Sequence, residues 1–146
     1  WSNYFELYKG FDASFSLRGI FGHQIYNVTR MVFSNPADAP TLNVLASALE
    51  GENAKITSDP TVSTFYLEDG DFIKLDNISI GYNIPLTNVS KIRNLRVFLN
   101  SNNLWMWTKY SGLDPELNFS GTEFGRDQYD VYPRTTSVTI GLNATF

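Results

Sequence analysis

Few residues in this sequence have the types and spacing that catalysis or metal binding would need. Three carboxylates, Glu68, Asp69 and Asp71, lie close together around Gly70. Glycoside hydrolysis uses two carboxylates at a fixed separation, so this cluster is the candidate for acid–base chemistry. The alternative is a charged entry to a β-strand, and we favour it.

A second acidic group consists of Asp114, Glu116, Asp127 and Asp130. Carboxylate oxygens are the ligands that Ca²⁺ prefers, so these residues are the candidate for a cation site. Their spacing does not match an EF-hand loop. The Asp114-Pro115 dipeptide is a turn signal in its own right. We favour the turn, and we expect no metal and no cofactor.

Composition excludes several other classes of function. Cysteine is absent, which excludes disulfides, thiolate metal sites and cysteine nucleophiles. The single histidine, His23, argues against histidine-based zinc sites and Ser-His-Asp catalysis. A net charge of −4 argues against a nucleic-acid partner, which requires clustered Lys and Arg. We therefore expect a protein that is not an enzyme.

The elements that must position these residues are β-strands, because the dominant hydrophobic period is two. From Ser137 to Phe146 every position alternates between polar and apolar. Similar patterns predict four strands, at approximately 11–22, 72–84, 95–107 and 134–146. Each is about twice as long as the usual strand of about 5–6 residues. The alternation reverses phase near Asp76-Asn77, which predicts a β-bulge or a strand that leaves an apolar layer.

Short and long connections alternate between the predicted strands. Residues 85–94 form a short link, whereas residues 23–71 and 108–133 form long ones, and the alternation places both long links on one side. Helical spacing of Leu42, Leu45, Ala46 and Leu49, between Thr41 and Gly51, predicts one short helix in the first long link. This arrangement is typical of a transmembrane β-barrel with long outer loops. A soluble β-sandwich is the alternative, although its turns normally recur every 8–12 residues or so.

Residues 65–85 read FYLEDGDFIKLDNISIGYNIP. This stretch most clearly, and several others, resemble the C-terminal part of the SusC/RagA-like, TonB-dependent outer-membrane transporters, although Lys74 replaces the arginine frequent in the family. Further matches are residues 103–116 (NLWMWTKYSGLDPE), residues 132–134 (YPR), residues 141–146 (GLNATF), residues 8–12 (YKGFD) and residues 22–27 (GHQIYN). The order and spacing of these motifs are specific, whereas any single one is weak.

The resemblance implies an all-β fold in which antiparallel strands form the C-terminal arc of a barrel in the outer membrane of a Gram-negative bacterium. Residues 1–146 would be a C-terminal fragment, without the plug domain and most of the barrel. It implies active import of an oligosaccharide or peptide, with TonB and a SusD-like surface lipoprotein as partners. Leu142, Ala144 and Phe146 would form the C-terminal signal for the barrel-assembly machinery. The competing hypothesis is a soluble, secreted β-sandwich that binds glycans.

Aromatic residues near the strand ends and within the second long link have two possible roles. Trp105, Trp107 and Tyr132 lie close to strand ends, and we assign them to the aromatic girdle at the membrane interface. Phe119, Phe124 and Tyr129 lie inside the link. These three are the candidates for contact with substrate or a partner.

Overall fold

The computed structural model describes residues 1–86, 91–116 and 125–146. The chain divides into two compact units. The sheet unit comprises Trp1–Ile20, Phe72–Trp107 and Arg134–Phe146, and the loop unit comprises Phe21–Asp71 and Thr108–Pro133. The strands are β1 (Ser2–Glu6), β2 (Phe11–Ile20), β3 (Gln24–Tyr26), β4 (Leu67–Asp69), β5 (Phe72–Asn83), β6 (Asn94–Thr108) and β7 (Ser137–Thr145). The α-helix is α1 (Val28–Phe33), and short 3-10 turns are η1 (Tyr8–Gly10), η2 (Pro36–Asp38), η3 (Ala46–Leu49), η4 (Asn53–Lys55) and η5 (Thr64–Tyr66).

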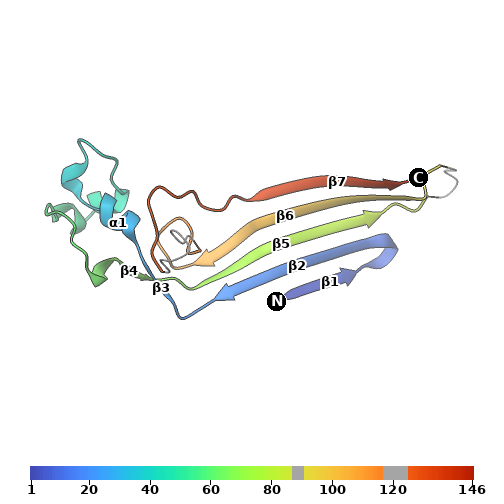
Figure 1. Cartoon of the computed structure of the whole chain (residues 1–146), viewed down its shortest axis with the longest axis horizontal. Coiled ribbons are helices and arrows are strands. Elements are labelled where there is room, and N and C mark those ends of the chain that lie inside the picture. Colours follow the sequence, from blue (N-terminus) through green and yellow to red (C-terminus); the bar gives the residue numbers. More distant parts are fainter. Residues whose placement is uncertain (87–90, 117–124) are drawn as a thin grey trace. The chain divides into compact units, whose positions relative to one another are not determined.

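The sheet unit is a single layer of five strands in the order β1-β2-β5-β6-β7 (Figure 1). Neighbouring strands run in opposite directions, and β5 and β6 reach 12 and 15 residues. The four predicted strands are therefore confirmed as β2, β5, β6 and β7. The fifth, β1, was not predicted, because Asn3 interrupts the apolar phase of a short segment. It pairs with β2, where Trp1 and Phe5 contact the Phe15 ring.

The predicted irregularity near Asp76 is a β-bulge. Ser16 pairs with Asn77 while the next residue of β2, Leu17, pairs with Leu75, so Asp76 is the extra residue. The bulge lets apolar residues stay on one face of β5 on both sides of the phase reversal, since one additional residue restores the alternation.

One face of the sheet is apolar and exposed. Val138, Ile140 and Leu142 of β7 are 62%, 77% and 62% exposed, and Leu99, opposite Ile140 on β6, is 42% exposed. The most deeply buried apolar side chains that the structure describes are Ile25, Val28, Ala48, Tyr66, Phe72 and Tyr110, of which only Phe72 belongs to the sheet unit. Among the residues that the structure describes, the sheet therefore has no hydrophobic core on its apolar side.

Charged and amide side chains pair on the opposite face. Arg18 Nε lies 2.7 Å from Asp76 Oδ2, and Arg96 Nη2 lies 2.7 Å from Asp12 Oδ2. Gly81 permits the second pair, because a Cβ atom there would lie 2.3 Å from Arg96 Nη2. Asn77, Asn100 and Asn102 are joined by hydrogen bonds of 2.8 Å. Burying these charges is favourable only because each meets an opposite charge or a hydrogen-bond partner.

The loop unit joins the two long links of the chain. β3 pairs with β4 within the first link, and Tyr26 forms a bridge to Arg126 of the second. The two long links therefore pack against each other within one unit. In the described ranges, no helix has the length and apolar character needed to cross a membrane.

The predicted helix exists in the first link, but its predicted position was wrong. The α-helix is Val28–Phe33, capped by Asn27, whereas residues 41–51 contain only the 3-10 turn Ala46–Leu49. Leu42 and Leu49 are 51% and 52% exposed, so their helical spacing does not mark a buried face. The backbone N–H groups of Thr41 and Leu42 both donate to the Asp38 carbonyl. These hydrogen bonds close a turn at the position where the helix was expected to begin.

We expect a charge on the apolar face to be costly and the same charge on the polar face to be tolerated. In the whole protein, Ile140→Arg should lower the yield of folded protein, because Arg facing lipid near the membrane midplane costs about 2–4 kcal/mol in a barrel. Thr139→Arg, on the neighbouring residue, is the matched control. The measurement is the amount of heat-modifiable, folded protein in outer-membrane fractions. Equal losses for the two variants would contradict the assignment of faces.

Candidate functional site

A buried carboxylate, Asp127, holds the start of α1. Its Oδ1 atom accepts hydrogen bonds from the backbone N–H groups of Val28 and Thr29, the latter at 3.2 Å. Its Oδ2 atom accepts the Tyr110 hydroxyl at 2.6 Å. Asp127 and Tyr110 are only 4% and 5% exposed. A carboxylate at this position satisfies backbone donors that a helix leaves unpaired at its N-terminus.

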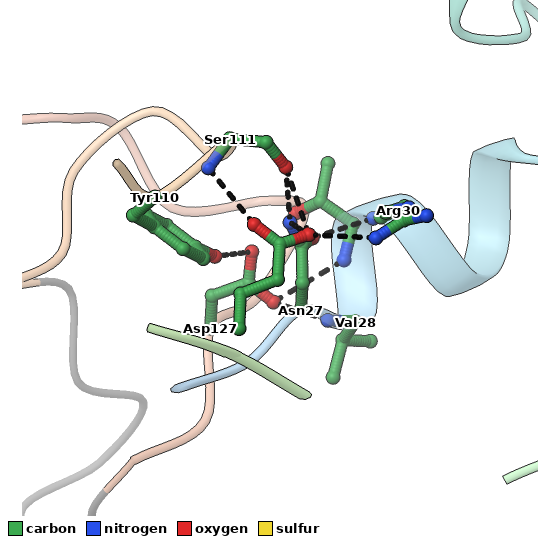
Figure 2. Close-up of polar contacts among 8 residues, drawn as sticks. Asn27, Val28, Arg30, Tyr110, Ser111 and Asp127 are labelled. Carbon is green, nitrogen blue, oxygen red and sulfur yellow. Dashed lines mark hydrogen bonds and ion pairs between the residues drawn. The ribbon is translucent and has the colours of Figure 1, made fainter. Parts of the chain in front are cut away.

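Glu68 forms the second centre of the network. Its Oε1 atom accepts hydrogen bonds from Asn27 Nδ2 (3.1 Å), Arg30 Nη1 (3.1 Å) and Ser111 Oγ (2.9 Å). Its Oε2 atom accepts the Ser111 backbone N–H at 2.9 Å. Figure 2 shows Tyr110 and Ser111 directed toward the residues at the start of α1. Glu68 and Asp127 therefore connect both long links, because each accepts hydrogen bonds from residues of the other link.

Asn27 lies at the start of α1 between Glu68, which accepts a hydrogen bond from its side chain, and Asp127, which accepts from the next two backbone N–H groups. It is 1% exposed, and its Oδ1 atom accepts the Arg30 backbone N–H at 2.7 Å as the N-cap of α1. Its own backbone N–H donates to the Tyr66 carbonyl at 2.8 Å. Asparagine is a favoured N-cap because its short side chain reaches the exposed N–H groups of the first turn.

The ionisation of these groups follows from their surroundings. Burial alone would raise the pKa of Glu68, but the hydrogen bonds from Ser111, Arg30 and Asn27 together lower it below its ordinary value. Burial, and then the hydrogen bond to Asp127, raise the pKa of Tyr110. At neutral pH, Glu68 is therefore an anion that accepts hydrogen bonds, and the Tyr110 phenol is neutral and donates one.

A pocket of about 380 Å³ lies beside this network in the loop unit. Arg30, Glu68 and Ser111 contribute polar groups to its lining, and Leu45, Ile56 and Phe65 contribute apolar surface. The guanidinium carbon of Arg30 lies 4.7 Å from the centre of the Phe65 ring. Ligand pockets commonly combine apolar walls with a few fixed polar groups, as this one does.

The carboxylates singled out from the sequence have structural partners. Asp69 Oδ1 accepts the Asp71 backbone N–H at 3.0 Å, and Asp71 Oδ1 accepts the Gly22 N–H at 2.6 Å. Together with the bonds to Glu68, these contacts support the charged strand entry over a catalytic pair. Asp114 accepts the Glu116 backbone N–H at 2.9 Å, which is the turn expected there. In the described parts of the chain, no three acidic or histidine side chains gather into a metal site.

Comparisons with known proteins show similarity to TonB-dependent receptors and to a peptide transporter. TonB-dependent receptor P39 of Formosa agariphila is 34% identical over 164 residues, and SusC of Bacteroides thetaiotaomicron, also a TonB-dependent receptor, is 32% identical over 152 residues. These matches cover 99% and 95% of this chain. Solved structures of the RagAB peptide transporter and of the RagAB peptide importer in a closed-closed state match with TM-scores of 0.78 and 0.77 at 25% identity. They cover 96% and 94% of this chain.

The chain is homologous to part of the SusC/RagA-like TonB-dependent receptors. It spans 14–16% of the length of the relatives it matches and 16% of the RagAB chains. A search of protein-family models found no match. The predicted family and the all-β, mainly antiparallel fold are confirmed by these similarities. The homologues are receptors and transporters, in agreement with the expectation of no enzyme activity.

The residues predicted to contact a substrate or partner, and those predicted to lie at a membrane interface, differ in what the structure shows of them. Phe119 and Phe124 lie outside the described residues. Tyr129 is 54% exposed and contacts Phe33 edge to face, with ring centres 5.7 Å apart. The proposed interface aromatics are all exposed: Trp105 by 52%, Trp107 by 45% and Tyr132 by 92%. Their assignment to the membrane interface stays a prediction.

Sequence reasoning did not find Asn27, Arg30 or Tyr110 as members of a site. Asn27 had a local signal, because asparagine three residues before Arg30 is a plausible N-cap. No local signal in the sequence indicates the hydrogen bond between Asp127 and Val28, since 99 positions separate the two residues.

We expect Asp127→Ala to loosen α1. The variant removes hydrogen bonds from a charged acceptor to Val28, Thr29 and Tyr110, each worth about 1.5–3 kcal/mol. Hydrogen exchange of the whole receptor should show faster exchange at the Val28 and Thr29 amides. Asp130→Ala, an exposed carboxylate three positions away, is the control and should leave these rates unchanged. Unchanged exchange in Asp127→Ala would show that the carboxylate does not hold the helix.

Proposed function

We propose that the protein containing this chain is a TonB-dependent importer of nutrients in the outer membrane of a Gram-negative bacterium. The observation that supports this most strongly is the similarity of nearly the whole chain to TonB-dependent receptors and to the RagAB peptide transporter. In this proposal, the sheet unit is part of the barrel wall and the loop unit is part of the outer loops. The chain supplies structure and substrate contacts, and it carries out no covalent chemistry.

The distribution of side chains in the sheet unit supports a place in a barrel wall. Its apolar face is exposed at Ile140 and Leu142 and has a lipid-facing character. Its opposite face carries the Arg18–Asp76 and Arg96–Asp12 pairs, as suits a wall that encloses a polar interior. The edge strands β1 and β7 each have one neighbour in the sheet, and further strands of a longer barrel would pair with both.

The proposed partners follow from the homologues. A SusD-like surface lipoprotein would cover the outer mouth, as the RagAB pairing suggests, and TonB would transmit energy through a plug domain. We propose that residues 1–146 are a C-terminal part of the barrel domain. The cargo is an oligosaccharide or a peptide.

The competing hypothesis, a soluble β-sandwich that binds glycans, has less support. A sandwich covers the apolar face of each sheet with a second sheet. The described residues of the sheet unit form one layer, and β7 exposes its apolar residues. Extraction separates the hypotheses, because a barrel protein requires detergent.

We propose that Leu142, Ala144 and Phe146 act in barrel assembly. Phe146 is 78% exposed and in phase with the apolar residues of β7. In the whole protein, Phe146→Asp should lower the amount assembled in the outer membrane, because it places a charge on the apolar face. Uptake per assembled molecule should stay close to the wild-type value. The measurement combines surface-assembled protein with uptake of labelled cargo.

Thr145→Asp, a change on the polar face of the same strand end, is the control and should assemble normally. Normal assembly of Phe146→Asp with lost uptake would refute the assembly role. A whole protein that fractionates as soluble, or uptake that persists without TonB, would refute the proposed function.

A further inference from the structure

We propose that the pocket beside Arg30 binds a peptide segment, with an apolar side chain against its walls and a backbone oxygen at the guanidinium. The inference deepens the proposed function and rests on it, since it assigns the class of cargo. The pocket's volume of about 380 Å³ suits one or two residues of a longer ligand.

The hydrogen-bonding groups of the pocket favour a ligand that accepts at Arg30. Glu68 already accepts four hydrogen bonds from Asn27, Arg30 and Ser111, three of them at Oε1 and one at Oε2, so most of its acceptor capacity is used within the chain. The guanidinium has five N–H donors, and among the described residues it uses one of them, toward Glu68. Within the described part of the chain, the pocket therefore offers more unused donors, on Arg30, than unused acceptor positions on Glu68.

A peptide backbone offers acceptors for the unused N–H donors of Arg30. A backbone carbonyl or a terminal carboxylate is a planar oxygen acceptor that a guanidinium recognises well. Asn53 lines the same pocket, and its Nδ2 atom donates to the Ser47 carbonyl at 3.0 Å. Its side-chain oxygen is an acceptor for a backbone N–H. A peptide unit offers both complementary groups.

The apolar walls favour a side chain over a sugar ring. Leu45, Ile56 and Phe65 line the pocket, and Ile56 and Phe65 are 47% and 55% exposed. Sugars commonly stack on an open aromatic face, and the Arg30 guanidinium occupies one of the two faces of the Phe65 ring, 4.7 Å from its centre. Burial of an aliphatic or aromatic side chain gives about 25 cal/mol for each Å² of apolar surface removed from water.

The test uses the whole transporter, purified in detergent with its surface lipoprotein. The probes are a tryptic digest of casein and a mixture of malto- and xylo-oligosaccharides, and mass spectrometry identifies what the protein retains. We expect retained peptides rich in apolar residues. Ser47→Trp, which fills the pocket from an exposed position, should lower peptide retention about tenfold, whereas Asn43→Trp, exposed in the same link, should not.

A second variant gives a readout that general damage would not produce. Ile56→Lys replaces an exposed apolar wall with a cation, so the retained peptides should change from apolar to acidic ones. Retention of oligosaccharides in place of peptides, or an unchanged peptide set in both Ser47→Trp and Ile56→Lys, would overturn this inference. Either result leaves the transporter assignment intact if the protein still assembles and imports cargo, whereas absence from the outer membrane would overturn the proposed function itself.

Discussion

The structure of the sheet unit depends on one constraint: its described residues form a single layer of strands, and no second layer among them covers the apolar face. Burial of apolar surface normally stabilises a sheet, yet Ile140 is 77% exposed. A hydrocarbon environment removes this difficulty, because lipid tails solvate such a face without cost. The same environment demands that charges lie on the other face and find partners there, as Arg18 does with Asp76.

The loop unit is stabilised in a different way, because its two long links need internal contacts to keep a defined structure in water. Its core is small, so buried polar contacts contribute much of the order. Asp127 and Glu68 accept hydrogen bonds from residues of both long links, and the removal of either carboxylate would leave several donors unpaired. The network also holds Arg30 at the wall of the pocket. In the proposed function, substrate contact and loop stability would thus depend on the same side chains.

The sequence predicts the long strands well because alternation of polar and apolar residues is a local pattern. It locates the Asp76 bulge for the same reason, since an extra residue reverses the phase. It does not predict β1, because Asn3 interrupts the alternation. It places the helix wrongly, because Leu42 and Leu49 have helical spacing but are exposed and form no buried face. The site is mostly hidden from sequence reasoning, because Asp127 and Val28 meet only through the fold. Glu68 drew attention as an acid, but its partners Asn27 and Ser111 come from distant segments.

The central proposal is that the long links face the outside of the cell, and the short link, residues 85–94, would then face the periplasm. Single cysteines in the whole protein, at Asn43 in the loop unit and at Lys91 in the short link, test it, because both positions are exposed and this chain contains no cysteine of its own. An impermeant thiol reagent applied to intact cells should label Asn43→Cys and leave Lys91→Cys unlabelled until the outer membrane is broken. Labelling of Lys91→Cys alone on intact cells would contradict the account.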